Sequence, residues 1–325
     1  MKTQAFLLHA LSPLHAGTGQ AVDVIDLPIA RMTATGMPYV PGSSIKGVLR
    51  DALRNAEWKR GDASGAQAPP DTQDPQAEIN SIGRRKDPEL VMAIFGPEAA
   101  DGASEHAGAL MAGDARLLAL PVRSYFGTFA WVTSPLLLAL AQRDFQEGNV
   151  PNVPTAIPNL KKFEAAPTDS DAAVVKDSKV LLVDLDIAVN KSEIDKAKAW
   201  GEFFAELLYP SDKKMVTKRF LVVDDETMTF LWETATQVET RIRLDPFTRT
   251  VAEGALWIEE SLPPESLLVG LLVSERIRRP GKHHGGQPWP SPEGVLEAVV
   301  SAAQPAVQFG GKATIGRGRC RFVKV

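Results

Sequence analysis

The sequence predicts an α+β protein with a ferredoxin-like core that large insertions interrupt. Two observations lead to this prediction. Apolar runs of strand length lie near both ends and in the middle of the chain, and segments with helical periodicity lie between them. Long stretches without periodicity, rich in Ala, Gly, Pro and Asp, separate these segments. The resulting order of a strand, a helix, central strands, a late helix and a last strand gives the outline of a ferredoxin-like (RRM-type) fold.

The first part of this core is a strand followed by a helix. Residues 3–11 form an apolar-rich run that is too short for a helix. Ser43 or Ser44 can cap a helix that runs to about Trp58. Its apolar side chains recur at helical spacing; they are Ile45, Val48, Leu49 and Leu53. The next residues, 59–87, lack periodicity and are predicted to belong to a flexible insertion.

The middle of the chain returns to strands and helices. The predicted elements are two or three strands within 107–133, a helix over 134–145, a strand over 179–187 and a helix over 192–208. Ser134 and Pro135 mark a helix start, because a capping side chain followed by proline at the first helical position is favourable there. Residues 146–177 are irregular.

The last third of the chain begins with a hairpin. Two alternating segments flank the turn-prone residues 246–249, so a hairpin over 236–259 is expected. The remaining elements are a strand over 267–273, a loop rich in Gly, Pro and His over 279–292, a helix over 293–303 and a closing strand over 318–325.

Composition restricts the function classes. The 325 residues carry a net charge of −4, which argues against a free-standing nonspecific nucleic-acid binder, since that class usually has a basic domain. A single cysteine, Cys320, excludes an intrachain disulfide and a multi-cysteine zinc site. The chain has no signal-peptide pattern and no run of about 18 apolar residues, so we expect a cytoplasmic protein without membrane contact.

Positive charge is concentrated in two places. Residues 309–325 contain five basic residues and no acidic one, and they include a glycine-rich segment that can bring backbone N–H groups close to a phosphate. Lys46, Arg50 and Arg54 follow one another at intervals of four on the first predicted helix. Either feature can serve RNA binding. A tight turn explains the glycines equally well, and a solvated helix face explains the stripe.

Several motifs together resemble the RAMP superfamily of CRISPR RNA-binding proteins. They are LSPLHAGTG at 11–19, VIDLPIAR at 24–31, YVPGSSIKGVLR at 39–50, LPVRS at 120–124 and FGGKATIGRGR at 309–319. Within that superfamily the combination is similar to the backbone subunits of type III-B effectors, the Cmr complexes. The resemblance is strongest over residues 5–54, 107–135, 236–260 and 307–322.

The resemblance implies a division of the single domain into named parts. It implies an RRM-like palm built mainly from 1–58, 107–145 and 263–325, a flexible insertion at 59–106, an insertion with a helix and strands at 146–235, and a β-hairpin thumb at 236–262. The thumb of the family separates guide and target bases.

The resemblance also implies catalytic residues. Asp26 corresponds to the catalytic carboxylate, which would hold a divalent metal ion, Mg²⁺ or Mn²⁺. His15 matches a family position and would assist, as would Glu239 on the hairpin, where the match is looser. Taken without the family, Asp26 is an ordinary turn former and His15 an ordinary loop histidine. Asp23 lacks the Leu-Pro-Ile context that follows Asp26.

Further residues are implied to contact RNA. The basic residues of the first helix line the guide RNA in the family, and the helix N-terminus is a plausible phosphate site. The implied RNA-binding residues are Ser43, Ser44, Lys46, Arg50, Arg241, Gly310, Gly311, Lys312, Gly316 and Arg317.

The function implied is that of a subunit that forms a homo-oligomeric filament along a guide CRISPR RNA. It would bind other Cmr-complex subunits and cleave bound complementary single-stranded RNA, acting as a metal-dependent endoribonuclease. Two alternatives stay open: a structural RNA-binding scaffold in which Asp26 only shapes its loop, and a backbone subunit of type III-A, which shares the Pro-Gly-Ser-Ser turn.

Overall fold

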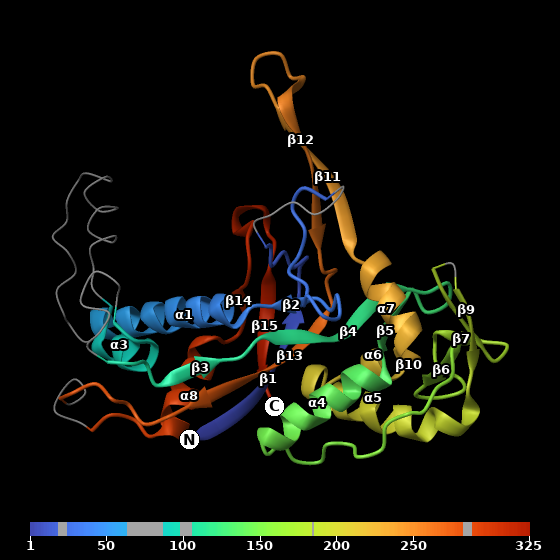
Figure 1. Ribbon diagram of the computed structural model, residues 1–325, viewed down its shortest axis with the longest axis horizontal. Coiled ribbons are helices and arrows are strands. Elements are labelled where there is room, and N and C mark those ends of the chain that lie inside the picture. The colour runs from blue at the N-terminus through green and yellow to red at the C-terminus, as the bar shows by residue number, and fades with distance from the viewer. Residues whose placement is uncertain (19–24, 64–86, 98–105, 184, 282–287) are drawn as a thin grey trace.

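The computed structural model covers residues 1–325 and describes all of them except 19–24, 64–86, 98–105, 184 and 282–287 (Figure 1). Its centre is a run of four antiparallel strands in the order β15–β1–β13–β4. Their bounds are Arg319–Lys324 for β15, Lys2–Ala10 for β1, Leu267–Ser274 for β13 and Ala115–Arg123 for β4. Phe6 of β1 pairs with Gly270 on one side and with Lys324 on the other.

Helices cover both faces of these strands. Because side chains alternate along a strand, β1 directs Phe6 and Leu8 to one face and Ala5 and Leu7 to the other. The first face packs against α1 (Gly42–Ala63) and α8 (Pro292–Ala302), which also contact each other. The second face packs against α4 (Pro135–Glu147) and α5 (Ile194–Leu208) through large buried aromatic residues. They are Trp131, Phe145, Trp200 and Phe204.

The sheet continues beyond β4 into the half of the chain drawn at the right of Figure 1. The order of the remaining strands is β5–β10–β6–β9–β8–β7, and β14 lies at the opposite edge, beside β15. The bounds are Phe129–Thr133 for β5, Phe220–Val223 for β10, Glu164–Pro167 for β6, Leu185–Val189 for β9, Lys179–Leu182 for β8, Val175–Lys176 for β7 and Val307–Gln308 for β14. Two short strands pair outside this path, β2 (Tyr39–Val40) with β4 and β3 (Leu110–Ala112) with β13.

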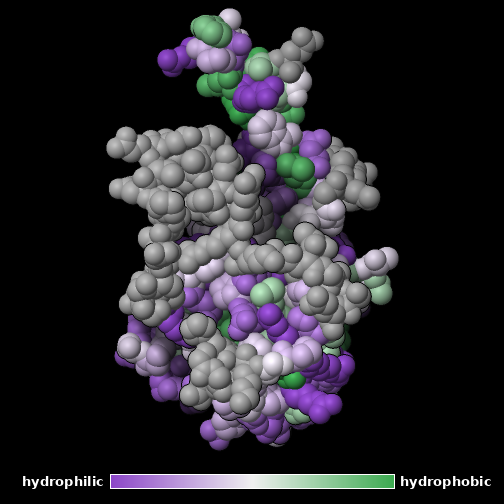
Figure 2. All heavy atoms as spheres, turned by 90° about the vertical axis from the view of Figure 1, so that its left-hand side faces the viewer, coloured by the Kyte–Doolittle hydropathy of each residue, from purple (hydrophilic) through white to green (hydrophobic). Residues whose placement is uncertain are grey.

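A two-stranded hairpin projects from this body (Figure 1). It consists of β11 (Gln237–Leu244) and β12 (Val251–Ser261), and α7 (Asp225–Thr234) leads into it. Figure 2 shows hydrophobic residues on its outer part, away from the body. Its exposed large apolar side chains are Val238, Ile242, Leu244, Phe247, Val251 and Leu256.

The structure differs from the sequence prediction in several elements. Helix α1 extends to Ala63 instead of about Trp58, and α3 (Glu89–Phe95) lies within the stretch predicted as a flexible insertion. All residues of α3 except Glu89 and Met92 are buried, so packing rather than periodicity stabilises this short helix. The short elements β6, β7, β10, α6 (Lys214–Thr217) and α7 were also not expected. In the described part of the chain, no helix combines the length and the apolar character that crossing a membrane requires.

Candidate nucleic-acid interface and active site

Asp26 lies against the outer edge of β12 at the base of the hairpin. Its Oδ2 accepts a hydrogen bond from the Ile258 backbone N–H over 2.7 Å. The next residue, Leu27, donates its N–H to the Ile258 carbonyl and accepts from the Glu260 N–H, each over 3.0 Å. These bonds fix the position of an otherwise exposed carboxylate. They also give Asp26 a structural role beside any catalytic one.

His15 is held by the same edge of β12. Its Nδ1 lies 2.7 Å from the carbonyl oxygen of Glu260, and Leu14 and Leu262 exchange two backbone hydrogen bonds of 2.9 Å beside it. A carbonyl only accepts, so Nδ1 carries the proton in this bond. A Cβ on Gly17 would lie 2.7 Å from Nε2, so the absence of a side chain at Gly17 leaves room beside that nitrogen.

The two side chains are therefore anchored two residues apart on one strand edge. Backbone groups of Ile258 bind the Asp26–Leu27 segment, and the carbonyl of Glu260 binds His15. At about 3.3 Å per residue, the two anchor points lie about 7 Å apart along β12. A carboxylate and an imidazole whose Nε2 bonds to no described residue thus occupy one edge of the hairpin base, which is an arrangement suited to moving a proton.

Glu260 was not predicted from the sequence, although it organises this edge. Its buried carboxylate accepts from the Ile29 N–H over 3.1 Å, from Arg31 over 2.5 Å and from the Thr236 hydroxyl over 2.9 Å. Arg31 also donates to the carbonyls of Gly36 and Trp232. A glutamate in an alternating strand carries no local signal for this role, because its partners come from distant segments.

Glu239, Arg241 and Arg317 form an ion-pair cluster on the hairpin. The Oε2 of Glu239 lies 2.5 Å from Arg317 and 2.8 Å from Arg241. Arg317 is buried and also donates to the Ser261 hydroxyl over 3.2 Å. These contacts connect the glycine-rich loop to the hairpin, and the Arg317 charge is balanced within the chain.

Lys312 makes a second connection between the loop and the hairpin. Its Nζ lies 2.9 Å from Oε1 of Glu259 and 5.9 Å from the centre of the Trp257 ring. Burial raises the pKa of Glu259, and hydrogen bonds from Trp257 and Lys312 outweigh it, so the pKa lies below its ordinary value. Glu259 is thus charged at neutral pH, and Lys312, about one-third exposed, is the more accessible partner.

The four glycines of the loop fall into two kinds. Gly310 and Gly318 have positive φ, and a Cβ on them would lie 2.1 Å from the His15 carbonyl oxygen and 1.9 Å from the Phe309 carbonyl oxygen. Around Gly316, also at positive φ, no atom lies within 4 Å of such a Cβ, and at Gly311 the nearest is a His15 ring carbon at 3.7 Å. Two glycines therefore serve close packing, while two leave open space.

The helix residues lie apart from the hairpin base. Ser43 is exposed and Ser44 half-buried in the first turn of α1, and the Gly42 N–H donates to Asp114 over 2.7 Å.

The basic residues of α1 differ in their partners. Arg50 lies 2.7 Å from Asp87, whose side chain is buried, and Arg54 contacts the same carboxylate. Lys46 has no ion pair among the residues that the structure describes. Burial and the Arg50 charge hold its pKa below the ordinary value. Of this stripe, Lys46 is thus the residue without an ion-pair partner in the part of the chain that the structure describes.

The structure thus gathers His15, Asp26, Glu239 and Arg241 with the glycine-rich loop at the hairpin base. Asp23 and Gly19 lie outside the described residues. Among the described residues, no group of three or more His, Cys, Asp or Glu side chains is arranged to hold a metal ion. The exposed carboxylate of Asp26 could supply one ligand to a Mg²⁺ ion, which usually takes one or two carboxylates and completes its shell with phosphates and water.

Comparison with known proteins gives consistent results. The model of the RAMP superfamily matches residues 7–321. The CRISPR system Cmr endoribonuclease Cmr4 of Pyrococcus furiosus is 30% identical over 327 residues, which cover 100% of this chain and 95% of that protein. The crystal structure of oligomeric Cmr4 from Pyrococcus furiosus is similar with a TM-score of 0.67 and 25% identity, covering 100% of this chain and 99% of that one. A chain of the cryo-EM structure of Type III-B Cmr-beta bound to cognate target RNA shares the fold, with a TM-score of 0.65, 18% identity and coverages of 100% and 97%.

Proposed function

This chain belongs to the RAMP superfamily, and we propose that it is the backbone subunit of a type III-B CRISPR effector, which binds guide RNA and cleaves complementary single-stranded RNA. The full-length similarity to a protein named Cmr endoribonuclease supports this proposal. The observation that carries it is the joint anchoring of Asp26 and His15 on one edge of β12, beside the glycine-rich loop.

The proposed reaction uses the 2′-hydroxyl of the target RNA as the nucleophile. Nε2 of His15 takes the hydroxyl proton where Asp26 holds the divalent ion; in the alternative scheme Oδ1 of Asp26 takes it. The 2′-oxygen attacks the adjacent phosphorus, and the bond to the 5′-oxygen breaks. The 5′-oxygen takes a proton from water, and the base returns its own proton to the hydroxide left behind, so the products are a 2′,3′-cyclic phosphate and a 5′-hydroxyl. DNA lacks the nucleophile and is not a substrate of this reaction.

A divalent ion belongs to the proposal. Asp26 would hold Mg²⁺ or Mn²⁺ together with phosphate oxygens, and the ion would stabilise the charge that develops on the scissile phosphate. Glu239 contributes indirectly in this scheme, because its carboxylate is occupied by Arg317 and Arg241. It holds the hairpin against the glycine-rich loop.

The proposed partners are the guide CRISPR RNA, the target RNA, other Cmr-complex subunits and further copies of this chain along the guide. The antiparallel order β15–β1–β13–β4, with α1 and α8 on one face, supports a ferredoxin-like core of RRM type. Lys46, Lys312, Gly311 and Gly316 are the RNA-binding candidates with charge or space at the surface. Ser43, Ser44, Arg50, Arg241, Gly310 and Arg317 remain in the proposal as contributors to the same surfaces.

One observation favours a second candidate function. The bond from Ile258 to Asp26 would hold the loop even in a scaffold without catalysis. The type III-A alternative shares the motif at the start of α1, but the LPVRS segment favours type III-B.

The test uses the assembled complex and end-labelled complementary RNA in Mg²⁺ or Mn²⁺. Asp26→Ala is expected to abolish cleavage while guide and target binding persist, and Asp23→Ala serves as the control and should cleave normally. Cleavage by the Asp26→Ala complex at the wild-type rate would contradict the catalytic assignment. Loss of cleavage in Asp23→Ala alone would show that the other carboxylate acts. RNA binding without cleavage by the wild-type complex would favour the scaffold.

A further inference from the structure

The turn between β4 and β5 presents an exposed aromatic ring beside a basic side chain. Residues 124–128 connect β4 to β5, Arg123 is the last residue of β4, and Tyr125 exposes 80% of its surface. It borders a hollow of about 370 Å³ that is lined by Arg123, Ser124, Tyr125 and Val183. Arg123 is exposed and forms no ion pair with any residue that the structure describes. A tyrosine this exposed gains nothing from burial within the chain.

A cationic side chain lies against the aromatic pair of this turn, and Arg123 lines the same hollow as Tyr125. The Phe126 ring meets the Tyr125 ring edge-on, with their centres 5.1 Å apart. Nζ of Lys176 lies 4.9 Å from the centre of the Phe126 ring. Aromatic faces next to Arg and Lys are the combination that binds single-stranded nucleic acid, because every base can stack and every nucleotide carries a phosphate.

Hydrogen bonds hold this turn in a fixed conformation. The Tyr125 N–H donates to the Leu181 carbonyl, and the Val183 N–H donates to the Arg123 carbonyl, each over 3.0 Å. Ser124 and Thr128 close the turn by a further backbone bond of 3.0 Å. Gly127 has positive φ, and a Cβ there would lie 2.9 Å from the Ala173 carbonyl oxygen. A preorganised platform loses little entropy when a base stacks on it.

The turn lies at the same end of the central strands as the candidate active site. β4 and β1 both run antiparallel to β13, with Leu267 of β13 opposite Ala119 of β4 and His9 of β1. The C-terminal ends of β4 and β1 therefore both lie at the N-terminal end of β13, where the chain arrives from the hairpin. RNA bound at the hairpin base can continue along this end of the sheet to Tyr125.

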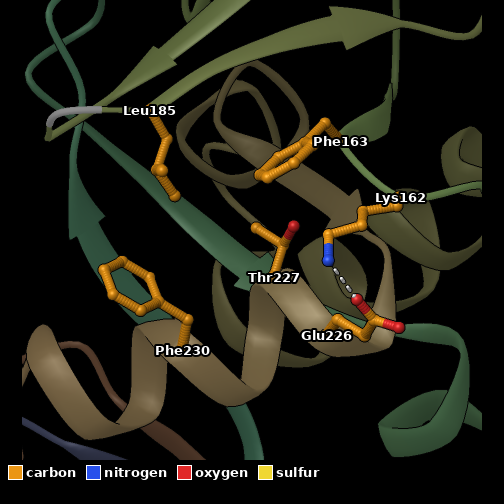
Figure 3. A pocket seen from close by; sticks show the side chains of 6 residues that line it. All are labelled: Lys162, Phe163, Leu185, Glu226, Thr227 and Phe230. Atoms are coloured by element: carbon orange, nitrogen blue, oxygen red, sulfur yellow. Dashed lines mark ion pairs between the residues drawn. The ribbon is translucent and has the colours of Figure 1, made fainter.

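A neighbouring hollow with a different character provides a comparison. Figure 3 shows Phe163, Leu185 and Phe230 around it, with Lys162 directed to Glu226. The two charges lie 2.8 Å apart, so this hollow offers apolar surface and a balanced ion pair. Arg123, in contrast, is not neutralised by any described residue. The difference favours a phosphate-bearing ligand at Tyr125 and not at Phe230.

We propose that Tyr125 and Arg123 form a further RNA-binding site, in which an unpaired base stacks on Tyr125 and an adjacent phosphate pairs with Arg123. The site rests on the proposed function, since it extends the same RNA track, but its residues take no part in cleavage.

The test uses the reconstituted complex with 4-thiouridine placed either in the guide or in the overhang of the target RNA. Photocrosslinking to the peptide that contains Tyr125 is expected from one of these strands, and that strand is the source of the base. Tyr125→Ala should weaken affinity for that RNA about tenfold, within the range of about 5- to 150-fold for one stacked base, and Tyr125→Phe should restore it. Arg123→Ala should lower the slope of log Kd against log salt by about 0.7.

Phe230→Ala is the matched control and should change neither affinity nor crosslinking. Unchanged affinity in Tyr125→Ala overturns the site while leaving the proposed function intact. The site is likewise overturned if Tyr125→Ala loses only binding to other Cmr-complex subunits, which would make it a protein contact. A wild-type complex that binds no RNA overturns both.

Discussion

His15 donates its Nδ1–H to the backbone carbonyl of Glu260 over 2.7 Å, and this bond connects the first loop of the chain to the last residues of the hairpin. It fixes the tautomer of the neutral ring, so Nε2 is the nitrogen that can accept a proton. Gly17 lies beside that nitrogen without a side chain. The orientation of the imidazole thus depends on one backbone carbonyl and one glycine.

Gly17→Ala is expected to lower target cleavage by about 10- to 100-fold while RNA affinity stays near the wild-type value. The new Cβ would lie 2.7 Å from Nε2, so the ring must move, and a displacement of about 1 Å at a catalytic group can cost about a hundredfold in rate. Single-turnover cleavage measures the effect. In a His15→Ala background the same change should have no further effect. A Gly17→Ala complex that cleaves normally would show that Nε2 is not used.

Lys46→Ala and Arg50→Ala are expected to have different effects, although the two residues lie on one helix stripe. Arg50→Ala leaves the buried Asp87 carboxylate with Arg54 as its ion-pair partner and should lower the free energy of unfolding by about 2 kcal/mol. Lys46→Ala should leave stability unchanged and weaken guide-RNA binding, with a smaller salt slope. Thermal melting and filter binding at two salt concentrations separate the effects. Unchanged affinity and salt slope in Lys46→Ala would remove this residue from the RNA track.

Gly311→Val is expected to disrupt RNA binding more than folding. A Cβ on Gly311 would lie 3.7 Å from the nearest atom, a ring carbon of His15, so the melting temperature should change little. A bulky side chain would nevertheless keep a phosphate away from the backbone. Gly310→Ala is the contrasting variant, because its Cβ would collide with the His15 carbonyl at positive φ and should lower the melting temperature. At Gly316 a Cβ would meet no neighbouring atom, but φ is positive. Gly316→Val should therefore lower both the melting temperature and the RNA affinity. Equal losses of folding and binding in Gly311→Val would make the loop a structural turn only.

The ionised Asp87 carboxylate is expected to stabilise the fold at neutral pH and to lose this effect in acid. Burial raises its pKa, and hydrogen bonds from Arg54 and Arg50 outweigh burial, so the pKa in the folded protein lies below the usual 3.8. A carboxyl with a depressed pKa stabilises the fold above its unfolded pKa and loses this effect as the pH falls through the folded value. The difference in melting temperature between wild type and Asp87→Asn should therefore be constant from pH 7 to about 5 and shrink below about pH 4. A difference that is independent of pH down to pH 2 would contradict this account.

Local patterns in the sequence determined much of the fold. The strand at 3–11, the helix after Pro41-Gly42, the hairpin around 246–249 and the last helix were predictable because each has its own periodicity, cap or turn residues. Helix α3 was not, because seven residues have little helical stability of their own and form a helix only by packing. The sequence motifs also predicted the RAMP superfamily, and the similarity over the full length of the chain confirms this prediction.

The arrangement of the candidate site was decided by the tertiary structure. Asp26 and His15 could be named from their motifs, but their common support on β12 depends on residues more than 230 positions away in the chain. The ion pairs Arg317–Glu239 and Arg50–Asp87 also join separated parts of the chain, 78 and 37 positions apart, and give two expected RNA-binding arginines a partner within the protein. Short-range periodicity reports which side of an element faces the core. It contains no information on which distant charge will lie within 3 Å, because that distance is set only when the sheet has assembled.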